Sequence, residues 1–283
     1  MSIANFVPAL WAGALLLNLN DQHVFKNGTN RDYEGELKGH GSSVKINSIG
    51  RMTISTYQPN TDLAAPETLN LAGQWLLIDQ GKTFHFGIDN LDKRQAEGDL
   101  MGPAMTEAAW GLADVCDSFI ATTIDNAMLT TNTLTAGTVG TGAGELNAYD
   151  VVVRANVIMD DNNVPAMGRW GFIPNWFAGM LRRDPRFSSF GTPGNVEQAK
   201  RGKPIGEVDG TILYKTNNIV LSGSDAKLAF GYKGAITFAE QITETVAYKP
   251  ERRFGDAVKG LHVYGAKVTR PNTLVTLVAT QGT

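Results

Sequence analysis

A glycine-rich run is the feature of this chain that is most similar to an enzyme motif. It reads Gly137-Thr-Val-Gly140-Thr-Gly142-Ala-Gly144 and precedes a possible helix. A dinucleotide-binding loop requires GxGxxG directly after a strand, and a P-loop requires a following Gly-Lys-Ser/Thr. The run has neither pattern, and the residues before it look like the end of a long helix. We therefore expect a flexible connector and no nucleotide site.

Metal-ligating and nucleophilic residues are few and widely spaced. The histidines are His23, His40, His85 and His262, and the single cysteine is Cys116. These residues are isolated from one another in sequence, so no metal-ligand spacing is present and we expect surface or packing roles for the histidines. The cysteine lies in an apolar-rich segment, which indicates an inert buried thiol. Because it is the single cysteine, an intrachain disulfide is excluded.

No other catalytic pattern is found. The chain lacks a GxSxG elbow, and Asp79, Asp89 and Asp92 are better suited to turns and helix caps than to a carboxylate pair across a cleft. We therefore predict that the protein is not an enzyme and has no catalytic, cofactor-binding or metal-binding residues.

Cationic residues are concentrated in one stretch. It contains Arg182, Arg183, Arg186, Lys200, Arg201 and Lys203. A solvated loop is one interpretation, and a contact with acidic groups of a partner subunit or with DNA is the other. We take Lys200, Arg201 and Lys203 as candidate intersubunit contacts.

Composition limits the class of protein. The 283 residues carry a formal net charge of -3, with 42% hydrophobic and 19% charged residues, which is ordinary for a globular chain. The charge argues against broad phosphate neutralisation and sequence-specific DNA binding. The apolar run from Val7 to Leu19 is too short to span a bilayer, and no Lys or Arg precedes it, so we expect no membrane contact.

The N-terminal third is expected to contain an arm and a hairpin. Residues 1–34 have the spacing of a short amphipathic helix followed by polar sequence, and this helix either docks on its own domain or reaches a neighbour as an arm. Residues 35–78 alternate as strands. The thin apolar face of this hairpin consists of Val44, Ile46, Met52, Ile54, Leu69 and Leu71. Because an isolated two-stranded hairpin is marginally stable, this face needs a partner surface, and we take these residues as candidate intersubunit contacts.

A strand over residues 83–88 and a long helix over residues 103–129 follow. The expected apolar stripe of the helix includes Leu112, Val115 and Phe119, while Glu107, Asp114, Asp117 and Asp125 are expected to face solvent. A connector over 130–144 comes next. Residues 146–159 are ambiguous between strand and helix, and we choose helix.

The rest of the chain is predicted to be mixed. We expect a strand over 170–173, a helix over 176–183, a loop from Phe190 to Pro204, and then short strands over 211–279 with one helix near 231–240.

Several blocks in the same order resemble a known family. The most specific are Asn163-Val-Pro165, Gly168-Arg-Trp170 and Pro174; others are Phe6-Val-Pro-Ala-Leu-Trp11, Ile88-Asp-Asn-Leu-Asp92 and Leu261-His-Val-Tyr-Gly-Ala-Lys-Val-Thr-Arg-Pro271. Together they resemble the major capsid (coat) proteins of tailed double-stranded DNA bacteriophages, in the branch related to the coat protein of the Salmonella phage P-twenty-two. Asn175 stands where that branch is expected to have a second proline.

The resemblance implies an α+β fold, the tailed-phage major capsid fold of the Hong Kong phage type. Its implied parts are an N-arm (1–34), an extended β-hairpin loop (35–78), a peripheral domain with a long spine helix (79–130), an axial domain (131–240) and closing strands shared by both domains (241–283). The implied function is self-assembly as hexamers and pentamers into an icosahedral shell around the genome.

The partners and location are implied by the same resemblance. Copies of the chain itself, a scaffolding protein, a portal and packaged double-stranded DNA without sequence-specific contacts are the implied partners. The implied location is the virion capsid, after assembly in the host cytoplasm. An encapsulin-type bacterial compartment shell is the alternative, and a soluble β-rich enzyme or binding protein is a second alternative from another class.

Overall fold

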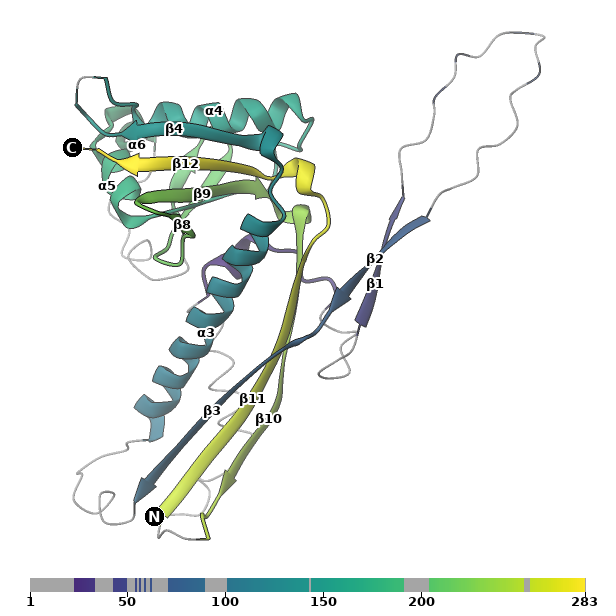
Figure 1. The fold of residues 1–283 in the computed structure, drawn as a ribbon, viewed down its shortest axis with the longest axis vertical. Helices are drawn as coiled ribbons and strands as arrows, with labels where there is room; N and C mark the ends of the chain where they lie inside the picture. The colour runs from purple at the N-terminus through teal and green to yellow at the C-terminus, as the bar shows by residue number, and fades with distance from the viewer. Residues whose placement is uncertain are drawn as a thin grey trace.

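Two β-sheets, one long helix and a hairpin organise the chain (Figure 1). The computed structural model describes residues 23–33, 43–49, 71–89, 101–142, 144–190, 204–251 and 255–282, with single residues at 54, 56, 59 and 62. The expected N-terminal helix and most of the loop from Phe190 to Pro204 lie outside these residues. The mixed helix and strand content agrees with the predicted α+β class.

The first sheet is long, narrow and antiparallel. Its strands are β3 (Gln80–Asp89), β10 (Ile236–Tyr248) and β11 (Gly255–Val268), in the order β10-β11-β3. Figure 1 shows α3 (Met101–Asn126) running beside this sheet. Met105, Ala109 and Leu112 of the helix form a core with Val258 of β11. The predicted strand over 83–88 and the long helix are confirmed, with α3 beginning and ending slightly earlier than expected.

The buried face of α3 differs from the predicted stripe in three places. Val115 is 44% exposed, Phe119 is only partly buried, and Asp117 is fully buried. The buried positions are Met105, Ala109, Leu112, Ala113, Cys116, Asp117, Ile120, Ala121 and Ile124. At 3.6 residues per turn this stripe leaves Val115 on the opposite side of the helix, so the predicted roles of Val115 and Asp117 were wrong.

The hairpin stem is antiparallel, as predicted. Strands β1 (Ser43–Ile49) and β2 (Leu71–Leu77) pair from Ser43 opposite Leu77 to Ile49 opposite Leu71. Because side chains alternate across a strand, the stem has two faces. Val44 and Ile46 lie on the buried face, whereas Trp75 and Leu77 are exposed.

The second sheet has seven strands, and the other α-helices of the described residues lie on one face of it (Figure 1). Its order is β4-β12-β9-β5-β7-β6, and β8 pairs with β9. The strands are β4 (Thr133–Val139), β5 (Arg169–Ile173), β6 (Pro204–Val208), β7 (Thr211–Lys215), β8 (Leu221–Ser222), β9 (Asp225–Tyr232) and β12 (Val275–Gln281). The helices are α4 (Ala148–Asp161), α5 (Asn175–Arg183) and α6 (Pro185–Phe190). Among the described residues, no helix is long and apolar enough to cross a membrane.

The ambiguous segment after residue 146 is helical, as predicted. Asn147 caps α4, because its side chain accepts a hydrogen bond from the backbone N–H of Tyr149 at 2.7 Å. Val151, Val152 and Met159 are buried on one side of the helix and join the core of the seven-stranded sheet. The cap and the buried face together outweigh the strand preference of the consecutive valines.

The C-terminal third departs from prediction. The expected helix near 231–240 is instead the end of β9, a short 3-10 turn, η6 (Lys233–Ala235), and the start of β10. Ile236 and Phe238 are buried in this strand, and β10 and β11 are long strands rather than short ones. The connector expected over 130–144 is also partly wrong. Its first two-thirds are η4 (Thr130–Asn132) followed by β4, which pairs in parallel with β12.

Candidate functional site

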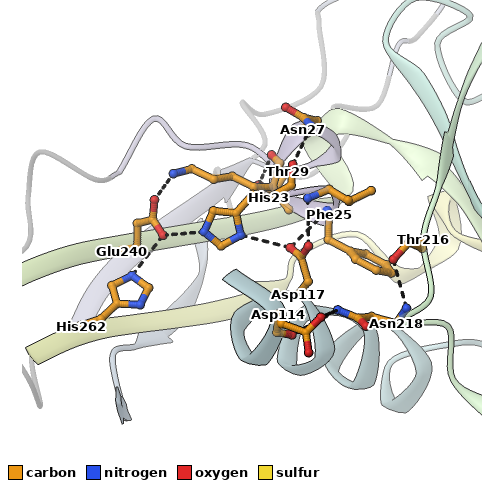
Figure 2. Close-up of polar contacts among 12 residues, drawn as sticks. His23, Phe25, Asn27, Thr29, Asp114, Asp117, Thr216, Asn218, Glu240 and His262 are labelled. Atoms are coloured by element: carbon orange, nitrogen blue, oxygen red, sulfur yellow. Dashed lines mark hydrogen bonds and ion pairs between the residues drawn. The ribbon is translucent and has the colours of Figure 1, made fainter. Parts of the chain in front are cut away.

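A buried polar cluster lies where the N-terminal segment, α3 and the three-stranded sheet meet (Figure 2). Its members are His23, Lys26, Asp117, Glu240 and His262. His23 precedes the short helix η2 (Phe25–Gly28), Asp117 is on α3, and Glu240 and His262 are on β10 and β11. Three parts of the chain that are far apart in the sequence, namely the N-terminal segment, α3 and the β10–β11 hairpin, therefore converge on one group of charges.

Backbone hydrogen bonds place the N-terminal segment at this junction. Asn30 donates its N–H to the carbonyl of Ile236 at 2.8 Å and accepts from the N–H of Phe238 at 2.9 Å. This parallel bridge joins Asn30 to Thr237 at the edge of β10, three residues before Glu240. Phe25 also packs on Phe172 of β5, with ring centroids 4.2 Å apart. The segment thus connects the two sheets.

Asp117 holds the start of η2. Its carboxylate accepts hydrogen bonds from the backbone N–H groups of Val24 at 2.9 Å and Phe25 at 3.3 Å, and it lies 3.2 Å from Nδ1 of His23. The first N–H groups of a helix have no partner within the helix, so a carboxylate at this position satisfies them. Asp117 therefore attaches the N-terminal segment to α3.

Glu240 is the second anchor. One carboxylate oxygen pairs with the ammonium of Lys26, and the other lies 3.2 Å from Nε2 of His262 and 3.5 Å from Nε2 of His23. Burial lowers the pKa of His23, although Asp117 opposes the shift. Burial, with the charges of His23 and Lys26, lowers the pKa of His262 to about 3. Both imidazoles are therefore neutral at neutral pH.

Cys116 is next to this cluster and has the predicted inert character. The thiol is buried, and burial together with the charge of Asp117 raises its pKa well above the ordinary value. A protonated, inaccessible thiol is a poor nucleophile. The described part of the cluster therefore suits a structural role rather than covalent catalysis.

The histidine prediction needs correction. His23 and His262 were expected to be isolated, but the fold brings both to Glu240, and His23, Cys116 and Glu240 present ligand-type atoms within 4.8 Å of one another. Spacing along the chain could not reveal this, because the residues come from separate elements. One signal was present: Asp117 lies on the same helix face as Ala113, Cys116 and Ile120, where an acidic residue needs a buried partner.

The six hairpin candidates have different outcomes. Val44 and Ile46 are buried against Ala239 and Val263 of the same chain, so their surfaces are already covered, and we withdraw them as intersubunit contacts. Ile54, by contrast, is 95% exposed. Leu71 begins β2, and Met52 and Leu69 lie outside the described residues.

The basic candidates Lys200, Arg201 and Lys203 also lie outside the described residues. Earlier in the same basic stretch of the sequence, Arg186 is paired within the chain, because its guanidinium bonds Asp184 and Asp150 at 2.8 Å each. Arg182 and Arg183 are exposed at the end of α5.

The most specific sequence block has a structural explanation. Asn163 has a positive φ of 55° where the chain leaves α4. The buried side chain of Arg169 donates hydrogen bonds to the carbonyl of Val164 at 2.6 Å and the carbonyl of Pro165 at 3.0 Å. The block therefore forms a tight turn between α4 and β5, and its residues need no ligand to explain them.

Comparisons with known proteins cover nearly the whole chain. A family model described as "Phage capsid protein" matches residues 46–277. Among solved structures, one of Mycobacterium phage Che8 is 28% identical with a TM-score of 0.66, covering 90% of this chain and 91% of that chain. The capsid structure of cyanophage P-SCSP1u is 16% identical with a TM-score of 0.67 and coverages of 92% and 89%. The capsid of Ralstonia phage GP4 is 12% identical with a TM-score of 0.68 and coverages of 90% and 87%. No curated protein matches the chain by sequence.

Proposed function

The chain belongs to the phage capsid protein family, and from this premise we propose that it assembles as hexamers and pentamers into an icosahedral shell that encloses double-stranded DNA. The observation that carries the proposal is the end-to-end match, in which about nine-tenths of this chain and of the Che8 phage chain superimpose. The family is one of structural shell proteins, and the inert Cys116 agrees with a non-enzymatic role.

The shape of the subunit supports this proposal. Figure 1 shows the stem of β1 and β2 leading away from both sheets. Trp75 and Leu77 on its outer face are about half exposed. Large apolar side chains that are exposed to water on an arm do not stabilise a single subunit. When a neighbouring copy covers them, their burial stabilises the contact between the two subunits.

The finer parts of the family pattern are included in the proposal. Residues 1–34 act as an N-arm, 35–78 as the extended hairpin loop, 79–130 as the peripheral domain with α3 as its spine, 131–240 as the axial domain and 241–283 as shared closing strands. The Salmonella phage P-twenty-two branch is the proposed relationship. Scaffolding protein and portal are the proposed further partners, and assembly takes place in the host cytoplasm.

Particle size and content test the proposal. The full chain is produced in bacteria, alone and together with the genes that neighbour its own, and the product is analysed by sedimentation and electron microscopy. We expect closed particles of megadalton mass with five-fold and six-fold clusters. A product that is a monomer or dimer under both conditions contradicts the proposal. Particles from infected cells that contain a protein cargo and no nuclease-resistant DNA favour the encapsulin-type alternative.

The basic loop provides a second test. We propose that Lys200, Arg201 and Lys203 lie near the centre of each hexamer or pentamer, because they are concentrated in the segment assigned to the axial domain. Changing all three to glutamate should prevent assembly and leave the thermal transition of the subunit nearly unchanged. The control changes two exposed lysines elsewhere, Lys82→Glu and Lys249→Glu. Normal shells from the triple variant contradict this assignment.

A further inference from the structure

His23, Cys116 and Glu240 form a compact group of three ligand types. An imidazole nitrogen, a sulfur and a carboxylate oxygen lie within 4.8 Å of one another. Ligand atoms around a tetrahedral zinc ion lie about 3.3 to 3.8 Å apart, given metal–ligand lengths of about 2.0 to 2.3 Å. Small side-chain movements would therefore bring all three atoms onto one ion.

The orientation of His23 is that of a metal ligand. Asp117 lies 3.2 Å from its Nδ1, so the ring proton is assigned to Nδ1 and the lone pair to Nε2. Nε2 is buried, makes no hydrogen bond, and lies 3.5 Å from the Glu240 carboxylate (Figure 2). Two atoms with lone pairs thus face each other across a short gap. Carboxylate–histidine–metal arrangements fix the ring in this way.

The buried charges also favour a cation. The carboxylates of Asp117 and Glu240 are both almost inaccessible to water, and the one buried cation paired with them in the described structure is Lys26. Arg31 is 3.9 Å from Glu240 but its side chain is 40% exposed. When a dication and a Cys116 thiolate are present, the formal charges of Asp117, Glu240, Lys26, the thiolate and the ion add up to zero. Buried unpaired charge is costly, so this balance stabilises the junction.

We propose that the junction is a zinc site in which His23 Nε2, Cys116 Sγ and Glu240 Oε2 supply three of the four ligands of a tetrahedral ion. Nitrogen, thiolate and carboxylate ligands together suit Zn²⁺ and exclude Mg²⁺ and Ca²⁺, which prefer oxygen. Lys26 stays on the other oxygen of Glu240, and His262 orients this carboxylate from β11. Binding releases the thiol proton of Cys116 to solvent. The ion joins the N-terminal segment, α3 and β10 at one point.

Co²⁺ is the probe, because it replaces Zn²⁺ and gives a charge-transfer absorption band when a thiolate binds it. The full chain is treated with a chelator, reloaded with Co²⁺ or Zn²⁺, and its metal content is measured. We expect about one ion per chain, a thiolate-to-cobalt band, and loss of the band when Zn²⁺ is added. Since Cys116 is the chain's single cysteine, the band reports this residue alone.

Variants separate the site from adventitious binding. Cys116→Ala should abolish the band, and His23→Gln should weaken Zn²⁺ binding by at least roughly 10-fold to 100-fold. The control is His85→Gln, whose histidine is exposed and bonds Tyr248. Equal metal content in Cys116→Ala and the parent chain overturns the proposal. If either variant fails to fold, the parent chain still decides, because reloaded protein with neither bound zinc nor a cobalt–thiolate band also overturns it. The outcome does not depend on whether shells form.

Discussion

Gly265 of β11 lies directly against the backbone carbonyl of Leu77, at the end of β2, and leaves no room for a Cβ atom. This close approach occurs where β2 crosses β11, just before the chain enters β3. The crossing sets the direction in which the hairpin stem leaves the body. A glycine is needed here because backbone, which cannot move aside as a flexible side chain can, occupies the adjacent space.

Gly265→Ala should therefore destabilise the subunit and change the angle of the hairpin. The expected cost is about 1 to 3 kcal/mol, the usual range for overpacking, measured by denaturant unfolding. The matched control is Gly87→Ala on β3 of the same sheet, where a Cβ would meet only ordinary van der Waals neighbours. Equal stability of the two variants would show that the crossing has more room than the structure indicates.

Asp117→Ala should destabilise the junction between the N-terminal segment and α3. The change leaves the buried N–H groups of Val24 and Phe25 without their acceptor, so we expect a loss of about 3 kcal/mol. Glu107→Ala is the control, since Glu107 is an exposed acidic residue on the same helix. Denaturant titration measures both. A loss below about 1 kcal/mol for Asp117→Ala would mean that water replaces the carboxylate.

The stem and the distal part of the hairpin should have separable roles. Ile46→Ala removes a side chain packed in the subunit's own core, so it should cost about 2 to 4 kcal/mol. Ile54→Ala should leave the free energy of unfolding unchanged, because the side chain is exposed. If Ile54 contacts a neighbour, its variant should form fewer shells at a given protein concentration in a light-scattering assay.

A deletion tests the same separation more strongly. Replacing residues 50–70 with a short Gly/Ser linker keeps β1 and β2, and with them the buried faces of Val44 and Leu76. The product should show a cooperative thermal transition and sediment as a small species. Intact shells would remove the distal hairpin from assembly, while an unfolded product would place it in the subunit's own core.

Local patterns in the sequence identified many of the elements. The helix periodicity over residues 103–129 and the alternation over 83–88 both identified elements to within a few residues. The failures have a common physical cause. The polar cluster joins His23, Asp117, Glu240 and His262 through tertiary contacts, and no local spacing records them. Similarly, β10 was mistaken for a helix at its start because its pairing partner, β11, follows it in sequence and supplies half of its environment.

Phe119→Ala tests the corrected register of α3. Phe119 is partly buried and meets Tyr264 edge to face, with ring centroids 5.4 Å apart. The cost should therefore be about 1 to 3 kcal/mol, below the value of about 3 to 5 kcal/mol for a fully buried phenylalanine. Val115→Ala is the control on the exposed side and should cost less than about 0.5 kcal/mol. If denaturant unfolding shows a larger loss of stability for Val115→Ala than for Phe119→Ala, the corrected register of α3 is contradicted.

Asp184 should make the body of the subunit sensitive to acid. The side-chain hydrogen bond from Arg186 is the main reason that the pKa of Asp184 falls to about 2, and Arg186 also bonds Asp150 on α4. In the unfolded chain an aspartate has a pKa of about 3.9. The folded pKa is depressed, so the stabilisation is complete above about pH 4 and is lost as the pH falls toward 2.

The matching variant is Asp184→Asn, with Asp161→Asn as a control at an exposed aspartate. In urea unfolding from pH 7 to pH 3, Asp184→Asn should be less stable than the parent at pH 7. The difference between their free energies of unfolding should narrow below about pH 4. The Asp161 variant should follow the parent at every pH. If the difference in free energy of unfolding between Asp184→Asn and the parent stays constant with pH, Asp184 acts through packing rather than through its charge.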